Sequence, residues 1–179
     1  MEILKLESLS GNPFLDLGVN DYITEKIYVV SAIESGNSFE FSIREKKQHY
    51  RKIGNSIDKD FERLNSIIKK GHSFGAFHNG ELIAWAVCDL RSWNNSIFIE
   101  NILVNKNFRG QNIGRLLIKA INREARELEC RIVELETQNT NYQAIQFFQK
   151  AGFAITGINT KRYNDSTETA VFMSFDLLI

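Results

Sequence analysis

A strand-like segment that runs through a glycine-containing basic turn into an amphipathic helix constrains this chain more than any other feature. The segment spans residues 97–125 and reads IFIENILVNKNFRGQNIGRLLIKAINREA. After the turn, apolar residues recur near the helical period of about 3.6 residues, and polar residues occupy the other face. The turn therefore lies at a helix N-terminus, where backbone N–H groups lack intrahelical partners and the helix dipole is positive. This arrangement predicts a site for an anion such as a diphosphate.

The turn also contains residues that suit a phosphorylated ligand. Gly110 and Gly114 permit close approach of the backbone, because they carry no side chain. Four basic residues surround them: Lys106, Arg109, Arg115 and Lys119. These cations fit a phosphorylated cofactor, and they also fit a solvated helix face. The adjoining turn favours the first interpretation.

The order of these residues resembles the acetyl-CoA-binding signature of the GCN5-related N-acetyltransferases (GNAT). That signature is Arg or Gln followed by x-x-Gly-x-Gly/Ala, after a strand that ends in an apolar-Val pair. Arg109 and Gly114 match it, whereas Asn112 stands at the central Gly; Asn enters left-handed backbone conformations more readily than most residues. The resemblance implies an acetyl-CoA site made by Ile102, Leu103, Val104, Arg109, Gly110, Gln111, Asn112, Ile113, Gly114, Arg115, Asn141 and Phe148.

A second match lies downstream. Residues 141–153 fit the family's C-terminal helix and the strand after it, through Asn141, Ala144, Phe147, Phe148, Gly152 and Phe153. Shorter matches resemble the streptothricin acetyltransferase branch: Trp93-Asn94, residues 99–102, residues 135–139 and residues 170–172. The detailed resemblance covers residues 90–175, roughly the C-terminal half.

Composition limits the class of protein. At 179 residues and 43% hydrophobic content, the chain suits one domain, residues 1–179. Lys+Arg and Asp+Glu both total 22, so no overall cationic field favours nucleic acid or an anionic membrane. The start of the chain lacks the basic and continuous apolar pattern of a secretory signal, and no run reaches transmembrane length. We therefore expect a cytoplasmic protein with no nucleic-acid or membrane partner.

The cysteines and histidines indicate no metal site. Cys88 and Cys130 are far apart, sit in apolar surroundings and lack the spacing of a Cys or Cys/His metal site, so we expect buried, reduced thiols. The three histidines have neither metal-ligand spacing nor a Ser or Cys partner motif.

Periodicity predicts a mixed α/β fold with helices on both faces of the sheet. Hairpins are expected around residues 34–37 and at Asn79-Gly80, a strong turn signal. Strands are predicted at 3–6, 27–33, 39–43, 73–77, 82–90, 97–104, 132–136, 153–158 and 169–177, and helices at 60–70, from 113, and at 141–151. This order resembles the GNAT fold, in which two central parallel strands splay and leave a slot for the pantetheine arm.

Transfer of an acetyl group to an amine needs a base, because a protonated amine has no lone pair with which to attack. Glu100 interrupts an apolar strand beside the turn, at the position that often supplies the base in the family. The alternative is a strand carboxylate that forms a salt bridge with a neighbour. The resemblance to the family also implies that the N–H of Leu103 or Val104, at the strand splay, donates to the oxyanion.

The acid that protonates the leaving thiolate is less evident. Phe148 stands where many relatives have a Tyr, and it cannot donate a proton. Tyr163 matches a Tyr of the streptothricin acetyltransferases and is the catalytic candidate. Its alternative is a half-buried aromatic with a solvated hydroxyl.

The acceptor site is predicted from Asp89, Trp93, Asn101 and Glu136. Trp93 also fits packing at a strand end. Asn101 stands where the streptothricin acetyltransferases, which are antibiotic-resistance enzymes, usually have Asp. The loss of this carboxylate would weaken the attraction for a polycationic acceptor. Asn141 fits two roles equally, a hydrogen bond to pantetheine or a cap on the helix that follows.

These residues predict an acetyl-CoA-dependent N-acetyltransferase that acts on a primary amine of a small cationic molecule, with streptothricin suggested by the nearest branch. Alternatives are a polyamine, aminoglycoside, amino acid or protein N-terminus as acceptor. A silent acyl-CoA-binding module is a further alternative, because Asn112 and Phe148 depart from the pattern. A monomer and a homodimer are both compatible with the sequence.

Overall fold

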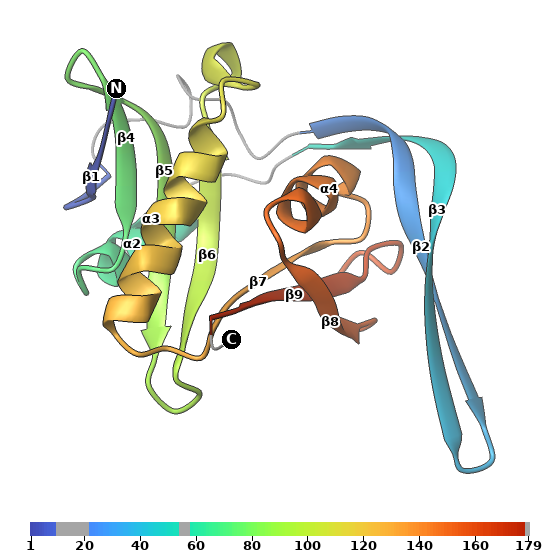
Figure 1. Cartoon of the computed structure of the whole chain (residues 1–179). Coiled ribbons are helices and arrows are strands. Elements are labelled where there is room, and N and C mark those ends of the chain that lie inside the picture. Colours follow the sequence, from blue (N-terminus) through green and yellow to red (C-terminus); the bar gives the residue numbers. More distant parts are fainter. Residues whose placement is uncertain (10–21, 54–57, 178–179) are drawn as a thin grey trace. The chain divides into compact units, whose positions relative to one another are not determined.

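The structure is a computed structural model that describes residues 1–9, 22–53 and 58–177 (Figure 1). Its contacts divide the chain into two compact units. The first unit is built from the described residues of Met1–Asn20, Gly54–Leu135 and Phe175–Ile179, and the second from Asp21–Ile53 and Glu136–Ser174. The candidate residues fall into both units, and each unit is described by itself.

Within the described residues, seven strands form a mixed sheet in the order β1-β4-β5-β6-β7-β9-β8, and β7 belongs to both units. The strands of the first unit are β1 (Glu2–Lys5), β4 (Phe74–His78), β5 (Glu81–Arg91) and β6 (Ser96–Val104), followed by β7 (Ile132–Gln138). Neighbours pair antiparallel from β1 to β6, whereas β6 and β7 pair parallel. This mixed α/β sheet with helices confirms the predicted fold class.

Two helices cover the sheet of the first unit. On one face, α2 (Asp58–Ile68) packs an apolar cluster against β5 and β6, made of Leu6, Leu9, Leu64, Ile67, Ile68, Trp85, Val87 and Leu103. On the other, α3 (Ile113–Glu127) lies along β4, β5 and β6 and buries Leu117, Ile121 and Ala125 (Figure 1). The apolar stripe predicted from periodicity is therefore the buried face of α3.

The β6–β7 pairing stops before either strand ends. Its register runs from Ser96↔Ile132 to Ile99↔Leu135, while β6 continues to Val104 and β7 to Gln138. The last residues of β6 thus lie beyond the parallel ladder. This early end of the ladder is what the predicted splay of two parallel strands requires.

The second unit contains a long hairpin and a small α/β element. Strands β2 (Tyr22–Ser35) and β3 (Ser38–Lys52) form a separate two-stranded sheet, and Figure 1 shows this hairpin extending beyond α4 (Tyr142–Lys150). Strands β8 (Ala154–Asn159) and β9 (Ala170–Asp176) pair antiparallel. The sequence predicted the hairpin and its turn, but it predicted shorter strands in the main sheet.

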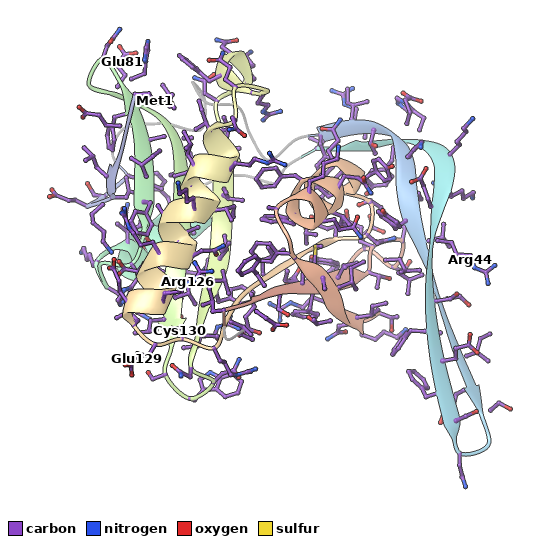
Figure 2. The ribbon with its side chains drawn as sticks, in the orientation of Figure 1. Met1, Arg44, Glu81, Arg126, Glu129 and Cys130 are labelled. Atoms are coloured by element: carbon purple, nitrogen blue, oxygen red, sulfur yellow. The ribbon has the colours of Figure 1, made fainter. Side chains whose placement is uncertain are left out.

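Turn residues adopt the backbone conformations that the sequence predicted. Asn79 and Gly80 both have positive φ, 52° and 83°, as the hairpin between β4 and β5 requires. Gly36 has φ 56° at the first position of the two-residue turn between β2 and β3. Both cysteines are free and buried, as expected, and Cys130 follows the end of α3 (Figure 2).

Candidate active site

The basic turn is held between the end of β6 and the start of α3. A short 3₁₀ helix, η1 (Lys106–Phe108), follows β6 and was not predicted. The Arg109 Nε donates a hydrogen bond of 3.1 Å to the Val104 carbonyl, which ties the turn back to the strand. Gly110 has φ 78°, and an added Cβ there would meet no atom within 4 Å.

Asn112 caps the start of α3 in an unusual way. Its backbone is left-handed, with φ 68° and ψ 6°, so the residue adopts the conformation that a glycine would supply. Its side chain makes no capping hydrogen bond, and none of the described residues in the first turn is acidic. The N–H groups of the first turn therefore remain directed out of the helix without a carboxylate beside them. This donor set fits the diphosphate of acetyl-CoA.

Substitution of Asn112 tests this backbone conformation. We expect Asn112→Gly to keep the free energy of unfolding within about 1 kcal/mol of the wild type, because Gly is free to take this φ. Asn112→Val should cost about 1–2 kcal/mol, because a β-branched residue is strained there. Urea denaturation of both variants measures the difference. Equal stability of the Val variant would contradict the left-handed turn.

Glu100 lies on a β-bulge in β6. The register passes from Val87↔Asn101 to Cys88↔Ile99, so Glu100 has no residue opposite it on β5. Bulges redirect a side chain and interrupt a ladder, and they recur beside active sites. The sequence pattern, an acidic residue in an apolar strand, singled out Glu100 but did not show the bulge.

Two arginines hold the Glu100 carboxylate. Arg63 of α2 donates to Oε2 at 2.9 Å, and Arg91 at the end of β5 donates to Oε1 at 3.3 Å. Arg91 also lies over the Phe98 ring, 3.5 Å from its centroid. The salt-bridged alternative considered for Glu100 is therefore present, and its catalytic role stays a prediction. Sequence reasoning missed both arginines, because neither belongs to a motif.

The end of β6 directs its peptide groups alternately to its two edges. The Asn105 N–H donates to the Ile83 carbonyl directly opposite, at 2.9 Å. Antiparallel ladders alternate, so Leu103 also faces β5, whereas Ile102 and Val104 direct their peptide groups to the other edge. The bond from Arg109 to the Val104 carbonyl agrees with this orientation. Of the two oxyanion donors predicted, the geometry favours Val104 over Leu103.

The acceptor candidates of the first unit differ in their surroundings. Asp89 accepts from Lys70 Nζ at 2.7 Å, and Asn101 Oδ1 accepts from the buried Trp85 Nε1 at 2.7 Å. Trp93 is 83% exposed in the β5–β6 turn, so the alternative of packing at a strand end is wrong.

A further carboxylate lies on β7. Glu134 accepts from Asn94 Nδ2 at 2.7 Å and from the Ser96 hydroxyl at 2.5 Å. Its register partner on β6 is Phe98, so the two side chains share one face of the sheet. Arg91 lies over Phe98 and also pairs with Glu100. Glu134 therefore lies on the same face of the sheet as the Glu100 carboxylate and its arginines.

The second unit holds the remaining candidates. Asn141 Oδ1 accepts from the Ala144 N–H at 3.3 Å, so the capping role of Asn141 is confirmed and its role toward pantetheine stays a prediction. Phe148 is buried and packs edge-on against Phe153, with ring centroids 5.4 Å apart. The Glu136 carboxylate accepts from the Tyr163 hydroxyl and, at 3.2 Å, from Arg162 Nε. The Tyr163 hydroxyl therefore donates its hydrogen bond to a carboxylate.

The environment of Tyr163 predicts a pH effect. Burial, the hydrogen bond to Glu136 and the charge of Glu136 raise the pKa of Tyr163 above its ordinary value. A tyrosine of the unfolded chain ionises near pH 10. Its contribution to stability is therefore present below that pH and is lost as pH rises above it. We expect the free energy of unfolding to fall above about pH 10, and less steeply in Tyr163→Phe. Identical slopes for the two proteins in denaturant titrations would contradict this.

The sequence model of the acetyltransferase (GNAT) family matches residues 37–153 of this chain. The match includes the turn, the bulged strand and the α4 helix. The chain belongs to the GNAT family. It is an N-acetyltransferase of that family, and its cofactor is acetyl-CoA.

Individual relatives agree with this assignment. A streptothricin acetyltransferase of Escherichia coli is 28% identical over 158 residues, which cover 86% of this chain and 84% of the relative. Another, of Streptomyces lavendulae, is 33% identical over 99 residues, 54% of this chain and 52% of the relative. The second alignment therefore spans about half of that protein.

Solved structures show the same GNAT fold. A nourseothricin acetyltransferase superposes with a TM-score of 0.78 at 24% identity, covering 98% of this chain and 99% of its own. A Bacillus anthracis protein described as a streptothricin acetyltransferase, in complex with acetyl coenzyme A, has a TM-score of 0.70 at 25% identity, with the same coverages. Over the described ranges, no helix of our protein is long and apolar enough to cross a membrane.

Proposed function

We propose that this GNAT enzyme transfers the acetyl group of acetyl-CoA to a primary amine of a small cationic acceptor, and that streptothricin is its first candidate acceptor. Such a reaction would confer resistance to the antibiotic. The similarity to a streptothricin acetyltransferase over 86% of this chain supports the choice of acceptor. We also propose that residues 1–179 act as one catalytic domain.

The observation that carries the proposal is the Glu100 bulge beside the open end of β6. When bound, the cofactor supplies an acetyl group activated as a thioester. Glu100 accepts a proton from the acceptor amine, directly or through one water. Arg63 and Arg91 hold one carboxylate oxygen each, so the position of the base is fixed before the acceptor binds.

A backbone N–H and Tyr163 stabilise the two negative charges that develop during transfer, on the carbonyl oxygen and on the departing sulfur. The Val104 N–H points away from β5, and it donates to the carbonyl oxygen on which negative charge develops. The Tyr163 hydroxyl already donates to Glu136, and burial keeps its pKa high, so it carries its proton at neutral pH. In this proposal Tyr163 is the proton donor for the departing sulfur.

Carboxylates on the sheet face of the first unit attract a cationic acceptor. Asp89, Glu100 and Glu134 lie there, but Lys70, Arg63 and Arg91 offset part of their charge. Asn101 adds no charge at the position where the resistance enzymes usually have Asp. The proposed site therefore attracts a cation less strongly than a wholly acidic one.

Asn101→Asp tests this charge balance. The variant carboxylate keeps an oxygen for the Trp85 Nε1 donor, so we expect the fold to be retained. One added negative charge near a polycation should lower the KM for streptothricin by about threefold or more at low salt. Asn101→Gln, which adds no charge, is the control. An unchanged KM in Asn101→Asp would place the acceptor elsewhere.

The acceptor itself is tested with a substrate panel. Streptothricin, spermidine, an aminoglycoside and an N-terminal peptide are each incubated with acetyl-CoA and enzyme, and kcat/KM is compared. We expect the highest kcat/KM for streptothricin, with a mass increase of one acetyl group on its product. A higher value for any other amine would reassign the acceptor without changing the reaction class.

A further inference from the structure

The distal half of the β2–β3 hairpin has an apolar face whose two phenylalanines, Phe39 and Phe41, are exposed. We call residues 29–44 the arm: the end of β2, the turn, and the start of β3. Midway along β2, where the arm begins, Tyr28 stacks on Tyr142 of α4, with ring centroids 5.4 Å apart. The same face continues outward through Val30, Ala32, Phe39, Phe41 and Ile43, and it ends at Glu34, which lies opposite Phe39. Phe39 and Phe41 contact each other and are 59% and 43% exposed.

An isolated hairpin is only marginally stable in water without further strands or a helix beneath its apolar face. The arm extends about 23 Å beyond Tyr28, from the rise of a strand per residue. Only β2 and β3 form this sheet in the part of the chain that the structure describes. The arm therefore needs a partner that covers its apolar face or completes its sheet.

The edge that receives a partner is β3. On β2, the Tyr28 N–H donates to the Asn139 carbonyl at 2.9 Å, so that edge is occupied where the arm begins. A two-residue turn closes on a hydrogen-bonded pair, here Ser35↔Ser38. By alternation, the peptide groups of Phe39, Phe41, Ile43 and Glu45 point away from β2. They form an open row along β3.

Charges on β3 are complementary to those of a second β3 strand. Glu40 and Arg44 flank Ser42 at equal distance on one face, and no described residue forms an ion pair with either. Figure 2 shows the Arg44 side chain projecting outward from the hairpin. In an antiparallel pair of β3 strands with Ser42 on the two-fold axis, Glu40 lies opposite the partner's Arg44, and the reverse. Phe41 then lies opposite the partner's Ile43.

We propose that two copies of this chain dimerise through β3, in a four-stranded antiparallel sheet centred on Ser42. The outward peptide groups of Phe41 and Ile43 hydrogen-bond to the partner's, which places Glu40 and the partner's Arg44 in a non-hydrogen-bonded pair, where side chains are closer. The two apolar faces join into one. A closed two-fold contact pairs the open β3 edge of each copy with that of the other.

Charge exchange tests this register. We expect the wild type to sediment as a dimer. Glu40→Arg and Arg44→Glu should each raise the dimer dissociation constant at least about tenfold, because each reversal places like charges opposite each other at two positions of the two-fold contact. The double variant Glu40→Arg/Arg44→Glu restores complementarity and should return the constant to within about threefold of the wild type. Lys46→Glu, on the same strand outside the predicted ion pairs, is the control.

The outcomes decide the proposal. Analytical ultracentrifugation over a range of concentrations gives the constants, and circular dichroism shows that each variant is folded. A monomeric wild type overturns the dimer. A dimer that both single reversals leave unchanged overturns the β3 register, and so does a double variant as weak as the single ones.

Discussion

Glu100→Gln should lower kcat for acetyl transfer by about two orders of magnitude, because general-base catalysis contributes about 10²–10⁴-fold and the amide cannot accept the proton. The amide keeps the shape of the side chain, and its oxygen can still accept from Arg63 or Arg91. Initial rates with saturating acetyl-CoA measure the effect. Acetyl-CoA affinity, measured by calorimetry, should change by less than about twofold, because Glu100 does not belong to the turn.

A matched control separates catalysis from the loss of an ion pair. Glu127 is an exposed glutamate whose carboxylate lies 3.9 Å from Arg123 in α3. Glu127→Gln removes a surface ion pair of the kind that contributes little, so its rates should equal those of the wild type. If Glu100→Gln keeps wild-type rates from about pH 6 to 9, Glu100 is not the base.

Gly114→Val should abolish most acetyl-CoA binding, with a loss of at least about tenfold in affinity. Gly114 lies in the first turn of α3, two residues after the left-handed Asn112. A branched side chain there keeps the diphosphate away from the N–H groups that hold it. Calorimetric titration with CoA measures the affinity directly.

The backbone of Gly114 is helical, so Val costs little through strain and the variant should remain folded. Gly114→Ala adds a single methyl group and should give a smaller loss of affinity, which orders the three proteins by side-chain size. Circular dichroism checks that α3 is intact. Wild-type affinity in a folded Val variant would place the cofactor elsewhere.

Strands and helices with a clear apolar period could be predicted from sequence, because one face of each is buried. The predicted strand at 97–104 and helix from 113 correspond to β6 and α3. The second half of β3, away from the hairpin turn, was missed, since residues 44–52 read REKKQHYRK and most of their side chains are exposed. A strand exposed on both faces leaves no period to detect.

The candidate site was predictable where the chemistry is local. The left-handed turn at Asn112 followed from the known tolerance of Asn for that conformation, and the structure confirms it. The bulge at Glu100 was not predictable, because it depends on the register between β5 and β6. The arginines on its carboxylate come from α2 and from the end of β5, and only the fold brings them to Glu100.

The separation of β2 and β3 into their own sheet was also beyond the sequence. The hairpin signal predicted that the two strands pair, and their register confirms this. Whether a hairpin joins a larger sheet depends on what its edges meet. Here Asn139 bonds to Tyr28 at the middle of β2. That contact joins residues far apart in the chain, and no local pattern predicts it.

The most direct test of the account is the release of CoA thiol from acetyl-CoA, followed with and without streptothricin for the wild type and Glu100→Gln. We predict CoA release that requires the acceptor, that is lost on Glu100→Gln, and that is accompanied by one acetyl group on the product. CoA binding without acceptor-dependent release, for streptothricin and for every amine of the panel, would contradict acetyl transfer and indicate a silent acyl-CoA-binding module.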